Sequence, residues 1–198
     1  MDKDATKRRF ERDLNRVSDA ILAAQQHFEI YHIYKNEQDR PKYADVCNHY
    51  LGFFHASISA QFTAMLLCLS KVMDKNPRNG TSLYSLAQTA QTNGLVQAKT
   101  LAEATGLLND AKELFGRIAI LRNNHFAHLG KLDSAEAFNR AGLCRNDLRN
   151  AIELAKDVFN KISYAYNQSR HSFGLSPTRD TYRLLNDLVS LNSQRSSQ

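Results

Sequence analysis

The sequence predicts an all-α protein, because its features favour long helices and none of them favours a sheet. The 198 residues include only 3 prolines and 8 glycines, so few positions interrupt a helix. Apolar residues recur at steps of three, four or seven, as they do along one face of a helix, and no segment alternates with period two. We expect one helical domain over residues 1–192, followed by a mobile polar tail at 193–198.

Two long helices are expected in the N-terminal part of the chain. The first runs from about Asp4 to Lys35. Its apolar stripe consists of Phe10, Leu14, Val17, Ile21, Phe28 and Tyr31. Pro41 suits the first turn of the second helix, which we expect to continue without interruption to Met73-Asp74.

Shorter helices are expected to follow, and their ends carry recognisable signals. Ser82 is a good N-cap, and Asn93-Gly94 is a good C-terminal stop. Ser176 precedes a proline, as an N-cap residue often does. The expected spans are 82–92, 96–130 with a possible bend at Gly106 and a stop at Gly130, a weak helix after Asp133, 146–167, a loop at 168–175, and a last helix after Ser176-Pro177.

The second long helix contains a stretch without charge, since Val46 to Ser70 includes no Asp, Glu, Lys or Arg. A membrane span is disfavoured by the polar side chains of this stretch, namely Asn48, His49, His55, Ser57, Ser59, Gln61 and Thr63. We therefore expect no membrane association. The helix should instead be buried on most of its circumference, either inside the bundle or against a second subunit.

Charge and cysteine usage suggest a partner and a compartment. The formal net charge is +6, which favours a partner with phosphates or carboxylates, with nucleic acid slightly ahead of a plain soluble surface. The 3 cysteines form no CxxC pair, and the N-terminus has acidic residues without an apolar core. A reducing, cytoplasmic location is therefore expected.

The segment LRNNHFAHLGK, residues 121–131, gathers polar groups at the end of a helix. A helix C-terminus carries partial negative charge, which favours a protonated imidazole and makes His128 a plausible proton donor. Arg122 and His128 are six positions apart, which places them about 120° apart around an ideal helix. They can converge only if the helix loosens near Gly130, or if a second chain presents its own copy.

This segment resembles the motif of HEPN ribonucleases, in which an Arg, usually followed by a polar Asn, Asp or His, is separated from a His by four to six intervening residues. The form R-N-x-x-x-A-H resembles the AbiU-type abortive-infection branch of these proteins, as do the segments LSKVMDKN and TSLYSLAQ. The order of the helices resembles that of the family over roughly residues 10–166. It implies a HEPN-like antiparallel bundle, a homodimer with a shared site, and RNA cleavage without a metal or cofactor.

The resemblance also implies roles for individual residues. Arg122 would hold the scissile phosphate, Asn123 would orient Arg122 or His128, and His128 would transfer a proton. The products would be a 2′,3′-cyclic phosphate and a 5′-hydroxyl. The setting would be phage defence or a toxin system, with an antitoxin or nucleotidyltransferase as a further possible partner. Contacts to RNA are expected from His125, Lys131, Arg117 and Arg145.

Each of these residues also has a simpler interpretation. Arg122 suits a solvated or salt-bridged surface, His128 a cap on helix carbonyls, and the basic residues around them a solvated face. His125 could be a core histidine with one hydrogen bond or a residue on a dimer axis. A zinc site at His125 and His128 is disfavoured, because no HExxH motif or cysteine pair accompanies them.

Two alternatives remain open for the whole protein. One is a catalytically silent HEPN-like module for dimerisation or protein interaction. The other is an unrelated helical bundle that binds nucleic acid through its basic face. A symmetric dimer built around the helix end at 121–130 would exclude the second.

Overall fold

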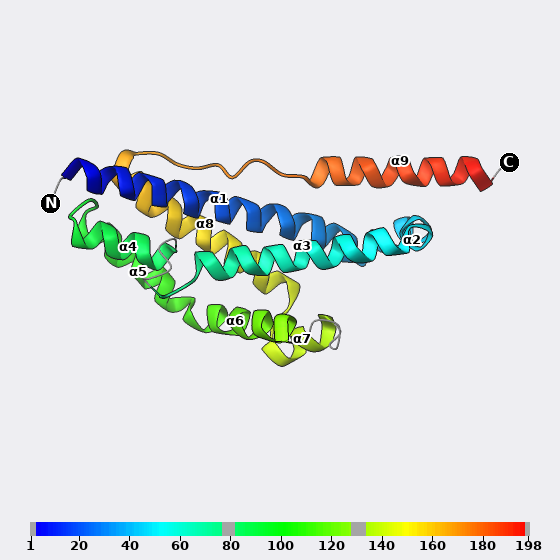
Figure 1. Cartoon of the computed structure of the whole chain (residues 1–198), viewed down its shortest axis with the longest axis horizontal. Coiled ribbons are helices and arrows are strands. Elements are labelled where there is room, and N and C mark those ends of the chain that lie inside the picture. The colour runs from blue at the N-terminus through cyan, green and yellow to red at the C-terminus, as the bar shows by residue number, and fades with distance from the viewer. Residues whose placement is uncertain (1–2, 77–81, 128–133, 197–198) are drawn as a thin grey trace.

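A computed structural model describes residues 3–76, 82–127 and 134–196 of the chain. These residues form nine α-helices, and none of them lies in a β-strand, so the expected all-α bundle is confirmed (Figure 1). The long axis of the molecule follows the first helix, and the C-terminal helix extends beyond the main bundle (Figure 1).

The centre of the bundle is formed by α1, Lys3–Lys35, and by α3, Leu51–Val72, which lies alongside it. The expected apolar stripe of α1 is buried along its whole length. It packs against side chains of α3 that are also buried, including Phe62, Met65 and Leu69. The first long helix is thus confirmed, and it supports most of the other elements.

The second long helix is not continuous, which corrects the sequence expectation. It consists of α2, Arg40–His49, and α3, which are separated at Tyr50, where the backbone leaves helical geometry at φ −109 and ψ 41. The break allows α2 to turn away and pack against the C-terminal helix. A second, smaller apolar cluster forms there around Ile33, Tyr43, Val46, Phe54 and Leu185. Tertiary packing therefore favours a break where no proline stands, and Gly52 lies in the first turn of α3, just beyond it.

The third expected helix is α4, Leu83–Thr92, which begins and ends as predicted. Ser82 forms a capping box with Ser85: its hydroxyl accepts the backbone N–H of Ser85, and its own N–H donates to the Ser85 hydroxyl. Gly94 follows the helix with φ +60, a left-handed conformation that suits a C-terminal stop.

The segment expected as one bent helix forms two, α5, Ala98–Asp110, and α6, Lys112–Ala127. The interruption lies at Ala111 and not at Gly106, which is an interior residue of α5. Ala111 is itself buried, so the change of direction occurs where the chain is packed in the core. The expected stop at Gly130 lies outside the described residues.

The weak and strong helices that were expected next are α7, Ser134–Ala141, and α8, Arg145–Asn167. The start of α8 is capped by Asp147, whose carboxylate accepts the backbone N–H of Cys144 at 2.7 Å. This hydrogen bond holds the pKa of Asp147 below its ordinary value. From there α8 runs back beside α1 and α5 and buries its apolar stripe against them.

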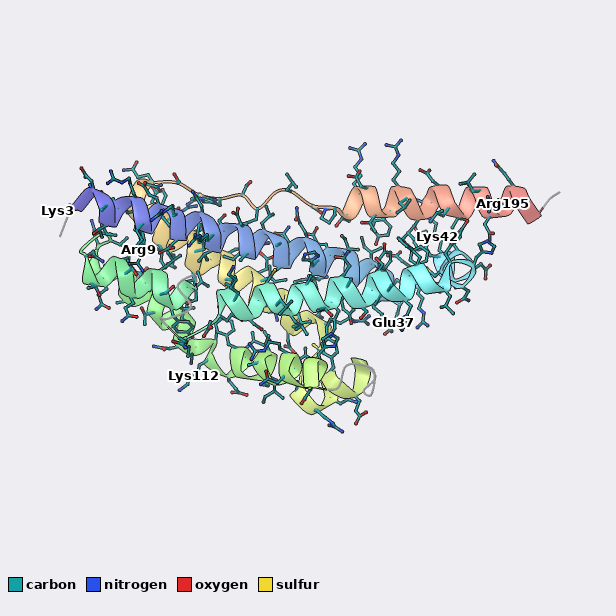
Figure 2. All side chains as sticks on the ribbon, in the orientation of Figure 1. Lys3, Arg9, Glu37, Lys42, Lys112 and Arg195 are labelled. Atoms are coloured by element: carbon teal, nitrogen blue, oxygen red, sulfur yellow. The ribbon has the colours of Figure 1, made fainter. Side chains whose placement is uncertain are left out.

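An extended segment, residues 168–177, then runs along α1 to the last helix, α9, Thr178–Ser196 (Figure 1). Asn160 holds this segment through paired hydrogen bonds with the backbone of His171, at 2.8 and 3.1 Å. Lys42 of α2 and Arg195 of α9 lie at the same end of the molecule (Figure 2). The helix continues to Ser196, so it reaches into the tail expected at 193–198.

The uncharged helix α3 is less enclosed than expected. One side packs in the core, but Leu51 and Phe53 keep 63% and 62% of their surface exposed, and Leu67 keeps 52%. Burial on most of the circumference is therefore not achieved within this chain. By length and hydropathy, α3 is the one helix of the described part that could cross a membrane, a test that core helices of soluble proteins also pass.

Candidate functional site

The candidate site lies on the C-terminal half of α6. This helix buries Phe115, Ile118 and Leu121 and packs against α3, α7 and α8. The positions that follow Leu121 carry the polar motif, so the motif begins where the buried stripe ends. Arg122 is half-buried and Asn123 is exposed.

Arg122 and Asn123 form a direct pair. The amide oxygen of Asn123 accepts two hydrogen bonds from the guanidinium, one from Nε at 3.1 Å and one from Nη2 at 2.8 Å. In the part of the chain that the structure describes, Arg122 forms no ion pair with a carboxylate. Asn123 thus holds the guanidinium through two of its nitrogens, while Nη1 takes no part in this pair.

His125 points from α6 to α3. Its Nε2 lies 2.8 Å from the Thr63 hydroxyl, and its ring meets Phe62 edge-on at 5.0 Å. Burial lowers the pKa of His125, so the imidazole is neutral near pH 7. These contacts agree with the interpretation of His125 as an interior histidine. A neutral ring also attracts phosphate less than a protonated one.

Two of the expected site residues, His128 and Lys131, lie outside the described residues. The relation of His128 to Arg122 is therefore known only from their separation in the sequence. The helix stop expected at Gly130 also lies outside the described residues.

The two arginines expected to bind RNA both hold parts of the fold together. Arg117 donates from Nη1 to the carbonyl of Gly142 at 2.7 Å and lies 4.0 Å from Glu113. Arg145 donates to the carbonyl of Lys35 and pairs with Glu37 at 3.1 Å. Each guanidinium has five N–H donors, so these bonds use only part of its capacity.

Other basic residues near the motif are engaged in the same way. Arg140 pairs with Glu136 at 2.6 Å, and Arg149 donates to His32 Nε2 at 3.1 Å. The partners of Arg145 and Arg149 lie on α1 or just after it, more than a hundred positions away in the sequence. Sequence spacing gives no signal for such contacts, and none for the pairing of His125 with Thr63.

The cysteines and carboxylates do not gather into a metal site within the described ranges. No group of three or more His, Cys, Asp or Glu side chains is placed there to hold an ion. Cys47 and Cys68 are partly buried, and burial raises the pKa of both thiols.

Comparison with known proteins identifies the family. Searches of curated proteins and of solved structures give no match. The HEPN_AbiU2 family model, described as AbiU2, matches residues 7–188, which is nearly the whole chain. The match begins in the second turn of α1 and ends within α9, and it includes the motif on α6. The chain therefore belongs to the HEPN AbiU2 family.

Proposed function

We propose that this protein is a metal-independent endoribonuclease of the phage-defence or toxin type, active in the cytoplasm as a homodimer. The observation that carries the proposal is the pair on α6, in which Asn123 holds the Arg122 guanidinium by two hydrogen bonds. Membership of the HEPN AbiU2 family supports it, because the matched residues include the motif R-N-x-x-x-A-H.

The proposed reaction is an internal transfer at phosphorus. The 2′-oxygen of a ribose attacks the adjacent phosphate and loses its proton, and the 5′-oxygen of the next nucleotide departs and gains one. His128 serves one of these two proton transfers, a contribution of about 10²–10⁴-fold in rate. The products are a 2′,3′-cyclic phosphate and a 5′-hydroxyl, with no requirement for a bound metal.

Arg122 supplies the electrostatic part of the proposal. Its planar guanidinium matches the geometry of phosphate oxygens better than an ammonium group does, and it stabilises the charge that develops on them. Because Asn123 already orders the side chain, less rotamer entropy is lost when the substrate binds. In this proposal His128 transfers a proton and Arg122 binds the phosphate.

A second copy of the chain completes the proposed site. Positions 122 and 128 lie about 120° apart around an ideal helix, so one chain does not bring both side chains to one phosphate without distortion. Two copies related by a two-fold axis would present Arg122 of one protomer beside His128 of the other. The proposed homodimer is thus inferred from the spacing of Arg122 and His128, the two residues that carry the proposed chemistry.

The affinity for RNA would come from guanidinium groups with unused donors. Arg117 and Arg145 keep N–H groups beyond those bound to Gly142, Lys35 and Glu37, and Lys131 adds a further charge in sequence. Phosphate contacts of this kind make binding weaker as the salt concentration rises.

The test is incubation of the purified protein with bacterial RNA in excess EDTA, beside Arg122→Ala and His128→Ala. We expect cleavage by the wild type alone, leaving cyclic phosphate ends. Circular dichroism of the three proteins controls for folding. If all three are folded, dimeric and inactive, the proposal fails, and the silent dimerisation module becomes the better description.

A further inference from the structure

The face of α3 that points away from the core carries two large apolar side chains, Phe53 and Leu67. Each of them is more than half exposed. Leu69, in contrast, is buried in the core, and at 100° per residue both exposed side chains lie about 160° around the helix from it. Phe53 and Leu67 therefore mark one outer face, which extends over most of the length of α3.

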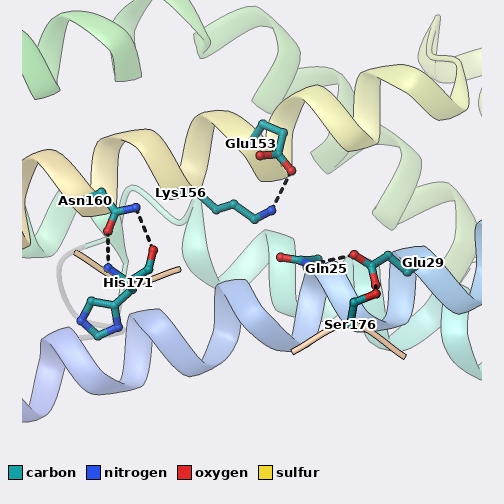
Figure 3. Close-up of polar contacts among 7 residues, drawn as sticks. All are labelled: Gln25, Glu29, Glu153, Lys156, Asn160, His171 and Ser176. Atoms are coloured by element: carbon teal, nitrogen blue, oxygen red, sulfur yellow. Dashed lines mark hydrogen bonds and ion pairs between the residues drawn. The ribbon is translucent and has the colours of Figure 1, made fainter. Parts of the chain in front are cut away.

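The chain covers the outer side of α1 but leaves this face of α3 open. The extended segment 168–177 runs along α1 (Figure 1). The Ser176 hydroxyl of this segment donates to Glu29 at 2.6 Å, and Asn160 holds the backbone of His171 through two hydrogen bonds (Figure 3). Within the described ranges, no segment is fastened in this way over the exposed residues of α3.

Charge makes this face one that a second copy of the chain can meet. The formal net charge is +6, so charged surfaces of two copies generally repel each other. No Asp, Glu, Lys or Arg occurs from Val46 to Ser70, and the next residue is Lys71. Two copies of this face would therefore meet without repulsion along most of their length, and both would remove apolar side chains from water.

The spacing of residues on this face suits an antiparallel pair of helices. Ala60 is exposed and stands seven positions after Phe53 and seven before Leu67, and all three lie within about 40° around the helix. In an antiparallel pair centred at Ala60, Phe53 of each copy would lie opposite Leu67 of the other. The two copies of Lys71 would then be about 33 Å apart along the helix axis, whereas a parallel pair would place these like charges side by side.

The antiparallel orientation also brings the two copies of the motif to one side of the helix pair. The Thr63 hydroxyl lies 2.8 Å from His125 Nε2, so the motif-bearing part of α6 lies beside α3 close to Ala60. The two-fold axis of an antiparallel pair lies between the helices at right angles to both, and it therefore keeps the two α6 ends on the same side. The two copies of Thr63 would be about 9 Å apart along the helix axis. A parallel pair would place the α6 ends on opposite sides.

We propose that a second copy of the chain covers this face of α3, with the two α3 helices antiparallel and the two-fold axis at Ala60. The inference rests on the proposed homodimeric ribonuclease. It adds the surface and the orientation through which Arg122 of one protomer would approach the motif of the other. The small side chain of Ala60 allows the helices to pack at about 8–10 Å between their axes, the usual distance for helices in contact.

Disulfide crosslinking of the full-length protein tests the proposal. The background is a cysteine-free chain, in which alanine replaces Cys47, Cys68 and Cys144. In this background Ala60→Cys places a thiol on the proposed axis, where it faces its own copy at the short distance that a disulfide requires. After oxidation with copper phenanthroline in air, we expect most of the protein to migrate at twice the mass of one chain, 22.5 kDa, on a denaturing gel.

The matched control is Leu191→Cys on α9, because Leu191 and Leu67 are equally exposed. Its product should migrate as one chain. Circular dichroism shows whether each variant is folded, and all of the substituted positions on α3 are exposed, so the core is left unchanged.

Two further positions determine the orientation. Phe53→Cys and Leu67→Cys, each made alone, should not crosslink, because the two copies of either thiol would be about 21 Å apart along the helix axis. The double variant should crosslink, because the thiol at position 53 of one copy would face the thiol at position 67 of the other. A parallel pair would instead crosslink each of the two variants alone.

The interface would be overturned if Ala60→Cys remained uncrosslinked like Leu191→Cys, and the face would then belong to another protein or to a membrane surface. The orientation would be overturned by crosslinking of Phe53→Cys alone or Leu67→Cys alone. None of these measurements uses RNA. Crosslinks in the expected pattern from a protein that cleaves no RNA would therefore support the interface and reject only the ribonuclease.

Discussion

At the residue scale, the pair formed by Arg122 and Asn123 is unusual for neighbours on a helix. Adjacent helical residues point about 100° apart, so their side chains do not ordinarily meet. Here the guanidinium folds back to the amide, and two hydrogen bonds hold it there. No carboxylate within the described residues draws it elsewhere. The guanidinium is therefore held at the end of α6, and its Nη1 takes no part in this pair.

The role of Asn123 can be tested by changing its acceptor. Asn123→Asp retains a carboxyl oxygen for the guanidinium, so we expect most of the RNA-cleaving activity to survive. Asn123→Leu removes the acceptor and should lower kcat about tenfold, with a smaller change in KM, because Arg122 loses its orientation and not its charge. Both are measured with a fluorescent RNA at several concentrations. Equal kcat values for the two variants would show that Asn123 does not orient Arg122.

His125 predicts a dependence of stability on pH. Burial lowers the pKa of the folded-state imidazole below its ordinary 6.5, so the unfolded chain takes up a proton that the folded chain resists. The stabilisation is complete above about pH 6.5 and is lost as the pH falls from there towards the folded-state pKa. The pKa of His32 is lowered as well and acts in the same direction.

We therefore expect the free energy of unfolding in urea to fall between about pH 7.5 and pH 5.5. His125→Gln keeps a polar group for Thr63 but does not titrate, so its stability should fall less over the same interval. His55→Gln, a change at an exposed histidine of α3, is the control and should behave like the wild type. Identical slopes for His125→Gln and wild type would contradict the prediction.

At the element scale, α9 is attached by a few specific contacts. The Tyr182 hydroxyl donates to Asp39 at 2.6 Å, the Tyr43 hydroxyl donates to Asn186 at 3.1 Å, and Leu185 is buried in the smaller cluster. The hydrogen bond to Asp39 raises the pKa of Tyr182 to about 12. One of these contacts therefore uses a carboxylate in the short connection between α1 and α2.

Tyr182→Phe should loosen α9 without removing its ring from the cluster. Loss of a hydrogen bond to a carboxylate costs about 1–2 kcal/mol, so we expect tryptic cleavage after Arg170 and Arg179 to accelerate by about fivefold or more. Tyr164→Phe is the matched control, because the Tyr164 ring is exposed and lies against Arg170. A digestion rate equal to that of the control would show that the bond to Asp39 does not hold the helix.

The same hydrogen bond determines how the stability of the protein changes at alkaline pH. The folded-state pKa of about 12 lies above the ordinary 10.0, so the neutral phenol is favoured by folding. Its contribution is complete below pH 10 and is lost as the pH rises from 10 towards 12. Tyr182→Phe should therefore lose less stability than the wild type over this interval.

The elements also show which parts of the fold a sequence can predict. Helices α1, α4 and α8 were predicted from apolar periodicity and from caps such as Ser82, which are local signals. The breaks at Tyr50 and Ala111 were not predicted, because each results from packing against elements distant in the sequence. The motif on α6 was found because its residues are adjacent. A pocket between α1, α8 and α9 was not predicted, because its lining residues Gln25, Arg149 and Thr178 lie far apart in the sequence.

At the scale of the whole molecule, the exposed side of α3 is left without a partner in the chain. No charged residue occurs from Val46 to Ser70, yet Phe53 and Leu67, which lie within about 40° of each other around the helix, are each more than half exposed. Exposed apolar side chains on a long uncharged helix indicate an interaction surface. His125 of α6 contacts Thr63 of α3, so this surface adjoins the helix that carries the motif. The proposed homodimer would cover both this surface and the motif on α6.

A charge placed on this side of α3 should therefore prevent dimerisation. Leu67→Glu would bury a carboxylate in the interface, and we expect sedimentation to give the mass of one chain, 22.5 kDa, where the wild type gives twice that value. Leu191→Glu on α9 is the matched control, because both leucines are 52% exposed and the substitution is the same. If the second copy completes the site, the Leu67→Glu monomer should also lose RNA cleavage while remaining folded. A dimeric Leu67→Glu protein would place the interface elsewhere, and an active monomer would show that one chain contains the whole site.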